Sequence, residues 1–172
     1  MLWLLVNSLL ALIELRMTLL DLPRWLLDEA FRSARLPGLM NEEVVRFFFD
    51  EYPSSPAAMH QWATPILNKL GQLLFDPDMR QIFGSPSSFD FRDLMDEGRI
   101  LLVNAPKGIL GEGLSALLAA FVVAHIQKAA LARASSQRRQ PFYLYLDEFQ
   151  NYTTDNIQDI LSESRKYALS LT

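Results

Sequence analysis

The sequence has no cysteine and only two histidines, His60 and His125. Without cysteine the chain has no disulfide and no thiolate metal site, and two histidines so far apart do not suggest a ligand cluster. Basic residues are also too few to dominate, since 16 Lys and Arg stand against 20 Asp and Glu and the formal net charge is −4. No overall positive field therefore favours nucleic acid or an anionic membrane, and any contact with DNA must be local.

The apolar stretch at the start of the sequence is short. Residues 1–13 would form a helix of about 20 Å, whereas the hydrocarbon core of a bilayer is about 30 Å thick. No basic segment precedes the stretch and no small-residue cleavage site follows it, so it does not have the pattern of a signal peptide. We expect it to be buried against other helices, and we expect no membrane span in the chain.

Half of the 172 residues are apolar, which is enough for a folded chain of one domain or a domain with an appended piece. Residues 1–84 are predicted to form an all-α helical subdomain. Its signals are helical spacing from Leu9 to Leu20, a restart at Pro23, an N-cap at Asn41, and a helix over 57–75 that is bent or interrupted at Pro65. The aromatic residues at 47–49 and Tyr52 are interpreted as core rather than as a platform for stacking bases.

Residues 85–172 have a different pattern, typical of an α/β fold. Short apolar runs at 99–104, 142–147 and 168–172 predict buried parallel strands, and helices are expected at 114–133 and 155–167. This order is β-α-β-α-β. Because parallel strands place their βα loops at one edge of the sheet, the loops at 104–113 and 147–154 should face the same crevice.

Asp147 and Glu148 end the second predicted strand and are the strongest functional signal in the sequence. A carboxylate held at the end of a buried strand can bind the hydration shell of Mg²⁺, and the next carboxylate can orient or deprotonate a water molecule. This is the pattern of a Walker B motif. Taken alone it is weak, because most Asp-Glu pairs that follow a strand only cap or solvate a turn.

A second candidate is the loop after the first predicted strand, where Lys107 and Gly108 precede Gly111, Gly113 and a helix. Backbone amides there could approach a phosphate, as in a small Rossmann-type nucleotide binder. The spacing matches neither a Walker A loop nor a full dinucleotide fingerprint, so we favour a tight connection at a subunit face. The basic loop at 133–140 is interpreted as a solvated crossover rather than a DNA contact.

Three blocks of the second half resemble the HerA/FtsK-like P-loop ATPases, in particular the TraD/TraG-type coupling ATPases of conjugation and type IV secretion. The blocks are GRILLVNAPKGILGEG at 98–113, PFYLYLDEFQN at 141–151 and LSESRKYALSLT at 161–172. The residues of the blocks, their order and their spacing all resemble those of the family. The resembling region begins near Pro65 and covers over half of the chain.

The resemblance implies a partial RecA-like core over 85–172, preceded by an insertion-like helical subdomain over 1–84. It further implies a hexameric ring that hydrolyses ATP with Mg²⁺ and translocates DNA, in the cytoplasm or at the inner face of the membrane, with the secretion machinery as a further partner. In such a site Asp147 would hold Mg²⁺ through water and Glu148 would activate the attacking water. Arg165 would reach the neighbouring subunit's nucleotide, whereas its helical position alone also fits an exposed charge.

The sequence departs from that family in one decisive respect, because no GxxxxGK[ST] loop is present. Without this loop nothing holds the β and γ phosphates, so the chain alone is expected to be inactive as an ATPase. We expect an internal fragment of the ATPase that carries Walker B and lacks both ends, with exposed apolar edges that promote self-association. The alternative function is a non-catalytic helical interaction module on an α/β scaffold.

Overall fold

The computed structural model describes residues 2–134, 139–147 and 165–171, with the backbone alone described at 165 and 171. The chain divides into two compact units, Met1–Pro86 and Ser87–Thr172. The sequence composition predicts the division after residue 84. Each unit has its own hydrophobic cluster and is described by itself below.

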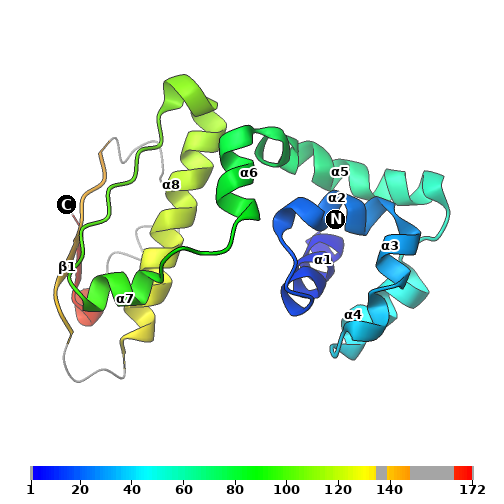
Figure 1. The fold of residues 1–172 in the computed structure, drawn as a ribbon, viewed down its shortest axis with the longest axis horizontal. Helices are drawn as coiled ribbons and strands as arrows, with labels where there is room; N and C mark the ends of the chain where they lie inside the picture. The colour runs from blue at the N-terminus through cyan, green and yellow to red at the C-terminus, as the bar shows by residue number, and fades with distance from the viewer. Residues whose placement is uncertain (1, 135–138, 148–164, 172) are drawn as a thin grey trace. The chain divides into compact units, whose positions relative to one another are not determined.

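In the described residues of the first unit the regular secondary structure is all helical (Figure 1). Its α-helices are α1 (Leu2–Glu14), α2 (Leu22–Leu27), α3 (Glu29–Ser33), α4 (Glu42–Arg46), α5 (Pro56–Phe75) and α6 (Pro77–Gly84). Short helical turns η1 (Leu19–Asp21), η2 (Leu36–Gly38) and the π-helical η3 (Phe47–Glu51) connect them. The predicted all-α character of this part of the chain is therefore found.

Side-chain caps define where these helices begin. Asn41 accepts hydrogen bonds from the backbone N–H groups of Glu43 and Val44, as predicted, and Asp28 and Asp76 cap α3 and α6 in the same way. The predicted boundaries fail at two places. The first helix ends at Glu14 rather than near Leu20, after which Arg16 has a positive φ of 54°, and the second is broken at Asp28, whose backbone is extended.

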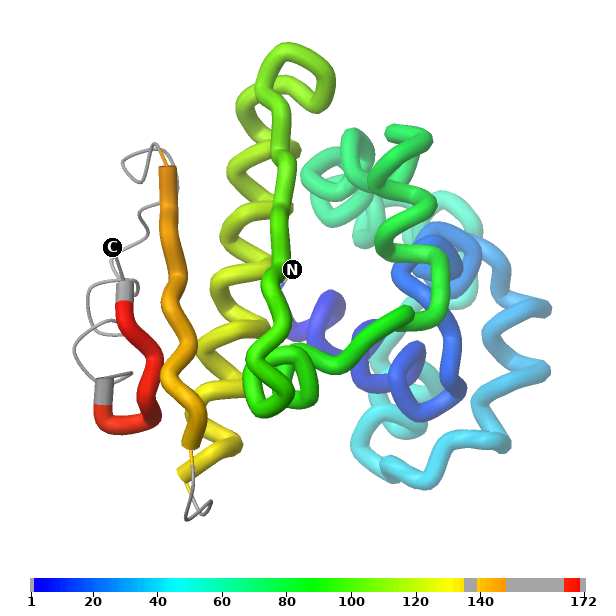
Figure 2. Tube along the Cα trace, turned by 60° about the vertical axis from the view of Figure 1, so that its left-hand side comes forward, coloured from blue at the N-terminus to red at the C-terminus, as the bar shows by residue number. Residues whose placement is uncertain are grey.

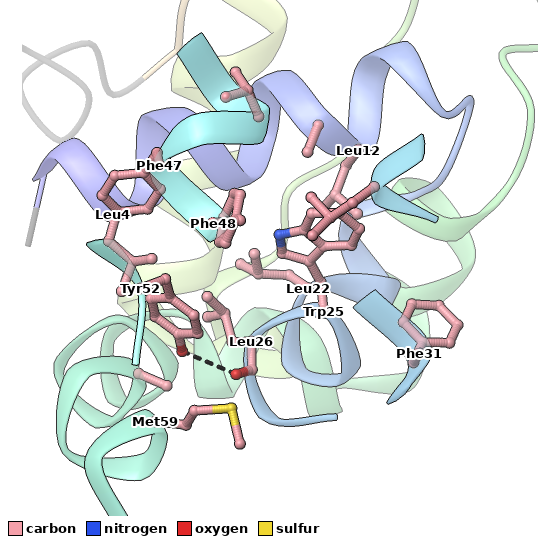
Figure 3. Close-up of a cluster of buried hydrophobic side chains, with 14 of the residues drawn as sticks. Leu4, Leu12, Leu22, Trp25, Leu26, Phe31, Phe47, Phe48, Tyr52 and Met59 are labelled. Atoms are coloured by element: carbon pink, nitrogen blue, oxygen red, sulfur yellow. Dashed lines mark hydrogen bonds between the residues drawn. The ribbon is translucent and has the colours of Figure 1, made fainter. Parts of the chain in front are cut away.

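The core of the first unit is built around Trp25, Leu22 and Leu26, which are fully buried (Figure 3). The predicted core role of the aromatic run is confirmed for Phe47, Phe48 and Tyr52, which are buried in the same cluster. Phe49 is instead 79% exposed and does not belong to the cluster. The Tyr52 hydroxyl donates a hydrogen bond of 2.8 Å to the carbonyl of Leu26, drawn as the dashed line in Figure 3.

A buried arginine closes this core from the side of α3. Arg32 is 3% exposed and donates to the carbonyl of Trp25 at 2.9 Å, so it satisfies a backbone acceptor near the end of α2. Its guanidinium carbon lies 4.8 Å from the centre of the Tyr52 ring. Burial lowers the pKa of Arg32, and the nearby Tyr52 is the largest influence in the opposite direction.

The second unit contains two α-helices and a pair of short strands in its described residues. The helices are α7 (Phe91–Asp96) and α8 (Lys107–Ala132), and the short 3₁₀ helix η5 (Arg165–Tyr167) precedes the last strand. Strand β1 (Phe142–Leu144) pairs in parallel with β2 (Leu169–Leu171), with Phe142 opposite Leu169. In Figure 2 the chain from 99 to 106 runs alongside β1, on the side away from β2.

The predicted β-α-β-α-β fold is wrong. The described chain is mostly helical, with eight α-helices and a two-stranded parallel sheet, and it does not contain a RecA-like sheet. Residues 99–104 run extended but are not a strand, and Ile100 and Leu102 are 87% and 89% exposed. A run of apolar residues indicates a tendency to be buried, but it does not supply the neighbouring backbone that a strand needs for its hydrogen bonds. Most of the helix predicted at 155–167 lies outside the described residues.

Two arginines hold the carboxyl-terminal end of α8. Arg133 is fully buried, and its Nε forms an ion pair with Asp96 Oδ1 at 3.0 Å. The geometry of this contact is not that of a hydrogen bond. Arg139 donates to the carbonyls of Arg133 and Ala134, and at 2.9 Å to that of Lys166. The interpretation of 133–140 as a solvated crossover is therefore wrong for Arg133, which is buried against an acidic partner. Arg139 is half-exposed and satisfies backbone acceptors at the end of α8.

Helix α8 is long and apolar enough to cross a membrane, judged by length and composition. Core helices of soluble proteins pass the same test. In this unit Ile126, Ala129 and Ala130 of α8 are buried in a cluster with Met95 of α7 and Leu169 of β2.

Candidate acidic site at the end of strand β1

A cavity of about 610 Å³ lies in the second unit, beside the end of β1. Three segments line it: residues 98–103 with Ala105, one face of α8, and residues 140–147. The α8 residues at its wall are all apolar, namely Ala119, Val122, Val123 and Ile126. The cavity is therefore a largely apolar space with the two extended segments along it.

Asp147 is the acidic residue among those that line this cavity. It lies in the turn just past β1 and is exposed to solvent. Asp147 follows the carboxyl end of β1, and β1 is parallel to β2. In open α/β sheets, ligands bind at the edge where the carboxyl ends of the parallel strands lie. Glu148, its predicted catalytic neighbour, lies outside the described residues.

The segment from 98 to 105 is fastened at both of its ends. The backbone N–H of Arg99 donates to the carbonyl of Leu94 at 3.0 Å, and the Ser115 hydroxyl donates to the carbonyl of Ala105 at 2.6 Å. Ser115 is fully buried on α8, so the second bond ties the segment to the helix. These two anchors hold the intervening residues extended beside β1 (Figure 1).

Lys107 and Gly108 form the first turn of α8 and are not among the residues that line the cavity. Lys107 is half-buried and Gly108 is exposed. A sharp break follows at Gly111, which has φ 76° and ψ 163° inside the helix. The glycines here thus make a short helical turn and a kink, an arrangement different from an open phosphate-binding loop.

Arg165 begins the 3₁₀ helix η5, which leads into β2. Its side chain lies outside what the structure describes. The structure therefore places Asp147 at the cavity. That Asp147 acts together with Glu148 and Arg165 stays a prediction.

A single carboxylate fits Mg²⁺ only in a particular way. Among the described residues, no group of three or more histidines or acids could enclose a metal ion. Mg²⁺ commonly keeps several waters and is held by one or two carboxylates together with substrate phosphates. Asp147 suits that mode, in which the nucleotide brings most of the ligands.

Sequence reasoning missed the cavity itself. The sequence predicts Ile100, Leu102, Tyr143 and Tyr145 as parts of buried strands, yet each is between 59% and 89% exposed. The sequence has no signal that separates an exposed apolar run from a buried strand. An apolar run without alternation predicts burial on both faces whether or not a neighbouring strand is present.

Comparison with protein-family models, curated proteins and solved structures finds no match to this chain. The resemblance to the HerA/FtsK-like ATPases therefore depends on the three sequence blocks alone.

Proposed function

We propose that this chain supplies the Walker B acids of a nucleotide site in a ring-forming, DNA-translocating ATPase of the HerA/FtsK type. Asp147 would hold Mg²⁺ through water, and Glu148 would take the proton of the water that attacks the γ-phosphate. Arg165 would reach the nucleotide of a neighbouring subunit. The observation that carries the proposal is the place of Asp147, exposed just past the carboxyl end of a parallel strand.

The division of labour in this site follows from the sequence. These 172 residues contain no Walker A loop, so the backbone amides and the lysine that bind the phosphates must come from outside them. The chain alone should therefore bind Mg²⁺ weakly and should not turn over ATP.

The Mg²⁺ role can be tested with Mn²⁺ as a paramagnetic substitute on the ¹⁵N-labelled full chain. We expect Mn²⁺, well below one equivalent, to broaden amide signals next to Asp147, and excess Mg²⁺ to restore them. Asp147→Asn should remove this local broadening, whereas Asp78→Asn, which changes an exposed acid of the first unit, should not. Broadening spread evenly over the acidic surface, or unchanged in Asp147→Asn, would contradict the proposal.

Catalysis needs a second test. A fusion that adds a GxxxxGK[ST]-bearing segment upstream should give Mg²⁺-dependent ATP hydrolysis, and Glu148→Gln should abolish it. Removing a general base typically costs about 10²- to 10⁴-fold in rate. Hydrolysis that Glu148→Gln leaves unchanged would remove this residue from the mechanism.

A second candidate, the helical interaction module, is favoured by the outer face of α1. Its exposed residues recur at helical spacing, whereas the opposite face of the helix is buried in the core. The exposed set is Leu2, Trp3, Val6, Leu10 and Ile13. Such a stripe is typical of a helix that docks against another surface.

This candidate is tested by changing the stripe without disturbing the core. Leu10→Lys with Ile13→Lys should abolish capture of a partner in a pull-down and leave the melting temperature within a few degrees. Deleting 90–172 should leave the capture intact. If the deletion abolishes capture, the first unit is not the interaction module.

A further inference from the structure

Strand β1 has one edge with which no described strand pairs. In the described sheet it pairs with β2 alone, and Leu169 and Ser170 of β2 are not among the described residues that line the cavity. In Figure 2 β2 (red) lies on one side of β1 (orange), and the extended segment of 99–106 (green) lies on the other. The cavity therefore lies at the edge of β1 that no described strand occupies.

The opposite wall of the cavity is also unpaired backbone. Among the described residues, 100–104 make no backbone–backbone hydrogen bond, although they are extended. Colours in Figures 1 and 2 show that this segment and β1 run in the same direction, both toward the beginning of α8. Two parallel rows of backbone donors and acceptors thus border one cavity.

The side chains around the cavity specify what could enter it. Its α8 wall is apolar, and outside it Ile100, Leu102, Tyr143 and Tyr145 are exposed on the two extended segments. An occupant would pack one face against the apolar α8 wall, and on its other face it would lie between these exposed side chains. Strands that are covered on both faces are near-continuous apolar runs rich in Val, Ile and Leu.

We propose that this cavity is a strand-addition site that receives an extended apolar segment of about five residues from another polypeptide. The added strand would pair with β1 on one edge and with residues 100–104 on the other, and so continue the β1–β2 ladder. Strands of about five to six residues are the commonest length, and strand addition uses main-chain hydrogen bonds for affinity and alternate side chains for specificity. A helix would fill the space without offering backbone donors to either edge, because its own are satisfied internally.

The proposal does not depend on Mg²⁺ chemistry at Asp147, so the two can fail separately. The probe is the neutral peptide acetyl-KEVIVIVEK-amide, labelled for fluorescence anisotropy with the full chain. We expect saturable binding, and hydrogen exchange should slow at the amides of both 100–104 and 142–145.

Two N-methylated peptides provide the sharpest control, since each removes the amide donors along one edge and keeps the apolar side chains. We expect each to bind at least about tenfold more weakly, because the added strand uses both edges; a factor of ten is the fold-change that one lost hydrogen bond commonly gives. Equal binding of either N-methylated peptide, or protection of only one of the two segments, would overturn the proposal. So would the absence of binding by the parent peptide up to its solubility limit.

A matched pair of variants on α8 adds a second line of evidence. Ala119→Phe fills the cavity from its apolar wall and should weaken the parent peptide at least tenfold, whereas Ala124→Phe on the exposed side of the helix should leave it within twofold. Circular dichroism checks that both variants remain folded. Binding that Ala119→Phe leaves unchanged, in a folded variant, would place the peptide elsewhere.

Discussion

Tyr52 shows how one buried hydroxyl links the first unit's core to pH. Its ring is buried, its hydroxyl donates to the Leu26 carbonyl, and burial raises its pKa to about 12. The positive charge of Arg32 opposes part of that rise. In the unfolded chain the tyrosine pKa is about 10. Stability that depends on neutral Tyr52 is therefore complete below pH 10 and is lost as the pH rises from about 10 toward 12.

This prediction is tested with Tyr52→Phe. At pH 7 the variant should lose about 1 kcal/mol of unfolding free energy, the net worth of a typical hydrogen bond. Between pH 7 and pH 11 the parent should lose roughly 1.4 kcal/mol more than the variant, because a raised pKa of the folded state favours the unfolded, ionised one. Urea unfolding at pH 7, 10 and 11 measures both differences. A parallel pH dependence of the two proteins would contradict the assignment.

At the scale of elements, the kink in α8 depends on one backbone conformation. Gly111 has φ 76° and ψ 163°, a region that is essentially restricted to glycine, and a Cβ added there would meet nothing within 4 Å. Conformation rather than space therefore forbids a side chain. Gly108 in the preceding turn also has open space around a Cβ and has no positive φ.

These two glycines form a matched pair for a stability measurement. Gly111→Ala should destabilise the second unit by about 1 to 3 kcal/mol, the cost of a strained backbone position. Gly108→Ala should be neutral or slightly stabilising, because alanine suits a helical position better than glycine. Urea midpoints of the two variants are compared with the parent. Equal shifts would show that the kink is not strained by a side chain.

What the sequence can predict follows from how local each signal is. The cap at Asn41 depends on neighbours within three residues, and that prediction is confirmed. The core role of Phe48 is also confirmed, because an aromatic side chain is predicted to be buried by its own apolar surface, although its partner Trp25 lies far away in the sequence. The end of α1 is missed, because the left-handed residue there is Arg16 rather than glycine. The strand at 99–104 fails because pairing depends on a partner backbone that no local pattern contains. The place of Asp147 at a strand end is predicted because a short apolar run followed by an acid is itself a local pattern.

At the scale of the whole molecule, apolar surface is the feature with the clearest consequence in solution. Ile100 and Leu102 are almost fully exposed, and Tyr143 and Tyr145 are mostly exposed beside a strand edge that no described strand occupies. Open edges with apolar side chains promote association. The net charge of −4 opposes this only modestly at physiological ionic strength.

We therefore expect the chain to associate as its concentration rises. Sedimentation velocity should show a weight-average mass that increases with loading, and Ile100→Lys with Leu102→Glu should move it toward the monomer value of 19.7 kDa. The exposed charge changed in Arg24→Glu serves as a control that leaves association unchanged. A stable monomer at all concentrations would contradict this prediction and the expectation of self-association from the sequence.

The open edge of β1 also bears on how long the chain survives in a cell. Chaperones and proteases sample states in which apolar backbone is accessible, and small changes in the exposed population alter abundance several-fold. A chain whose edge is covered only by a partner would be cleared quickly when synthesised in excess of that partner. Its steady-state level would then follow the supply of the strand that covers it.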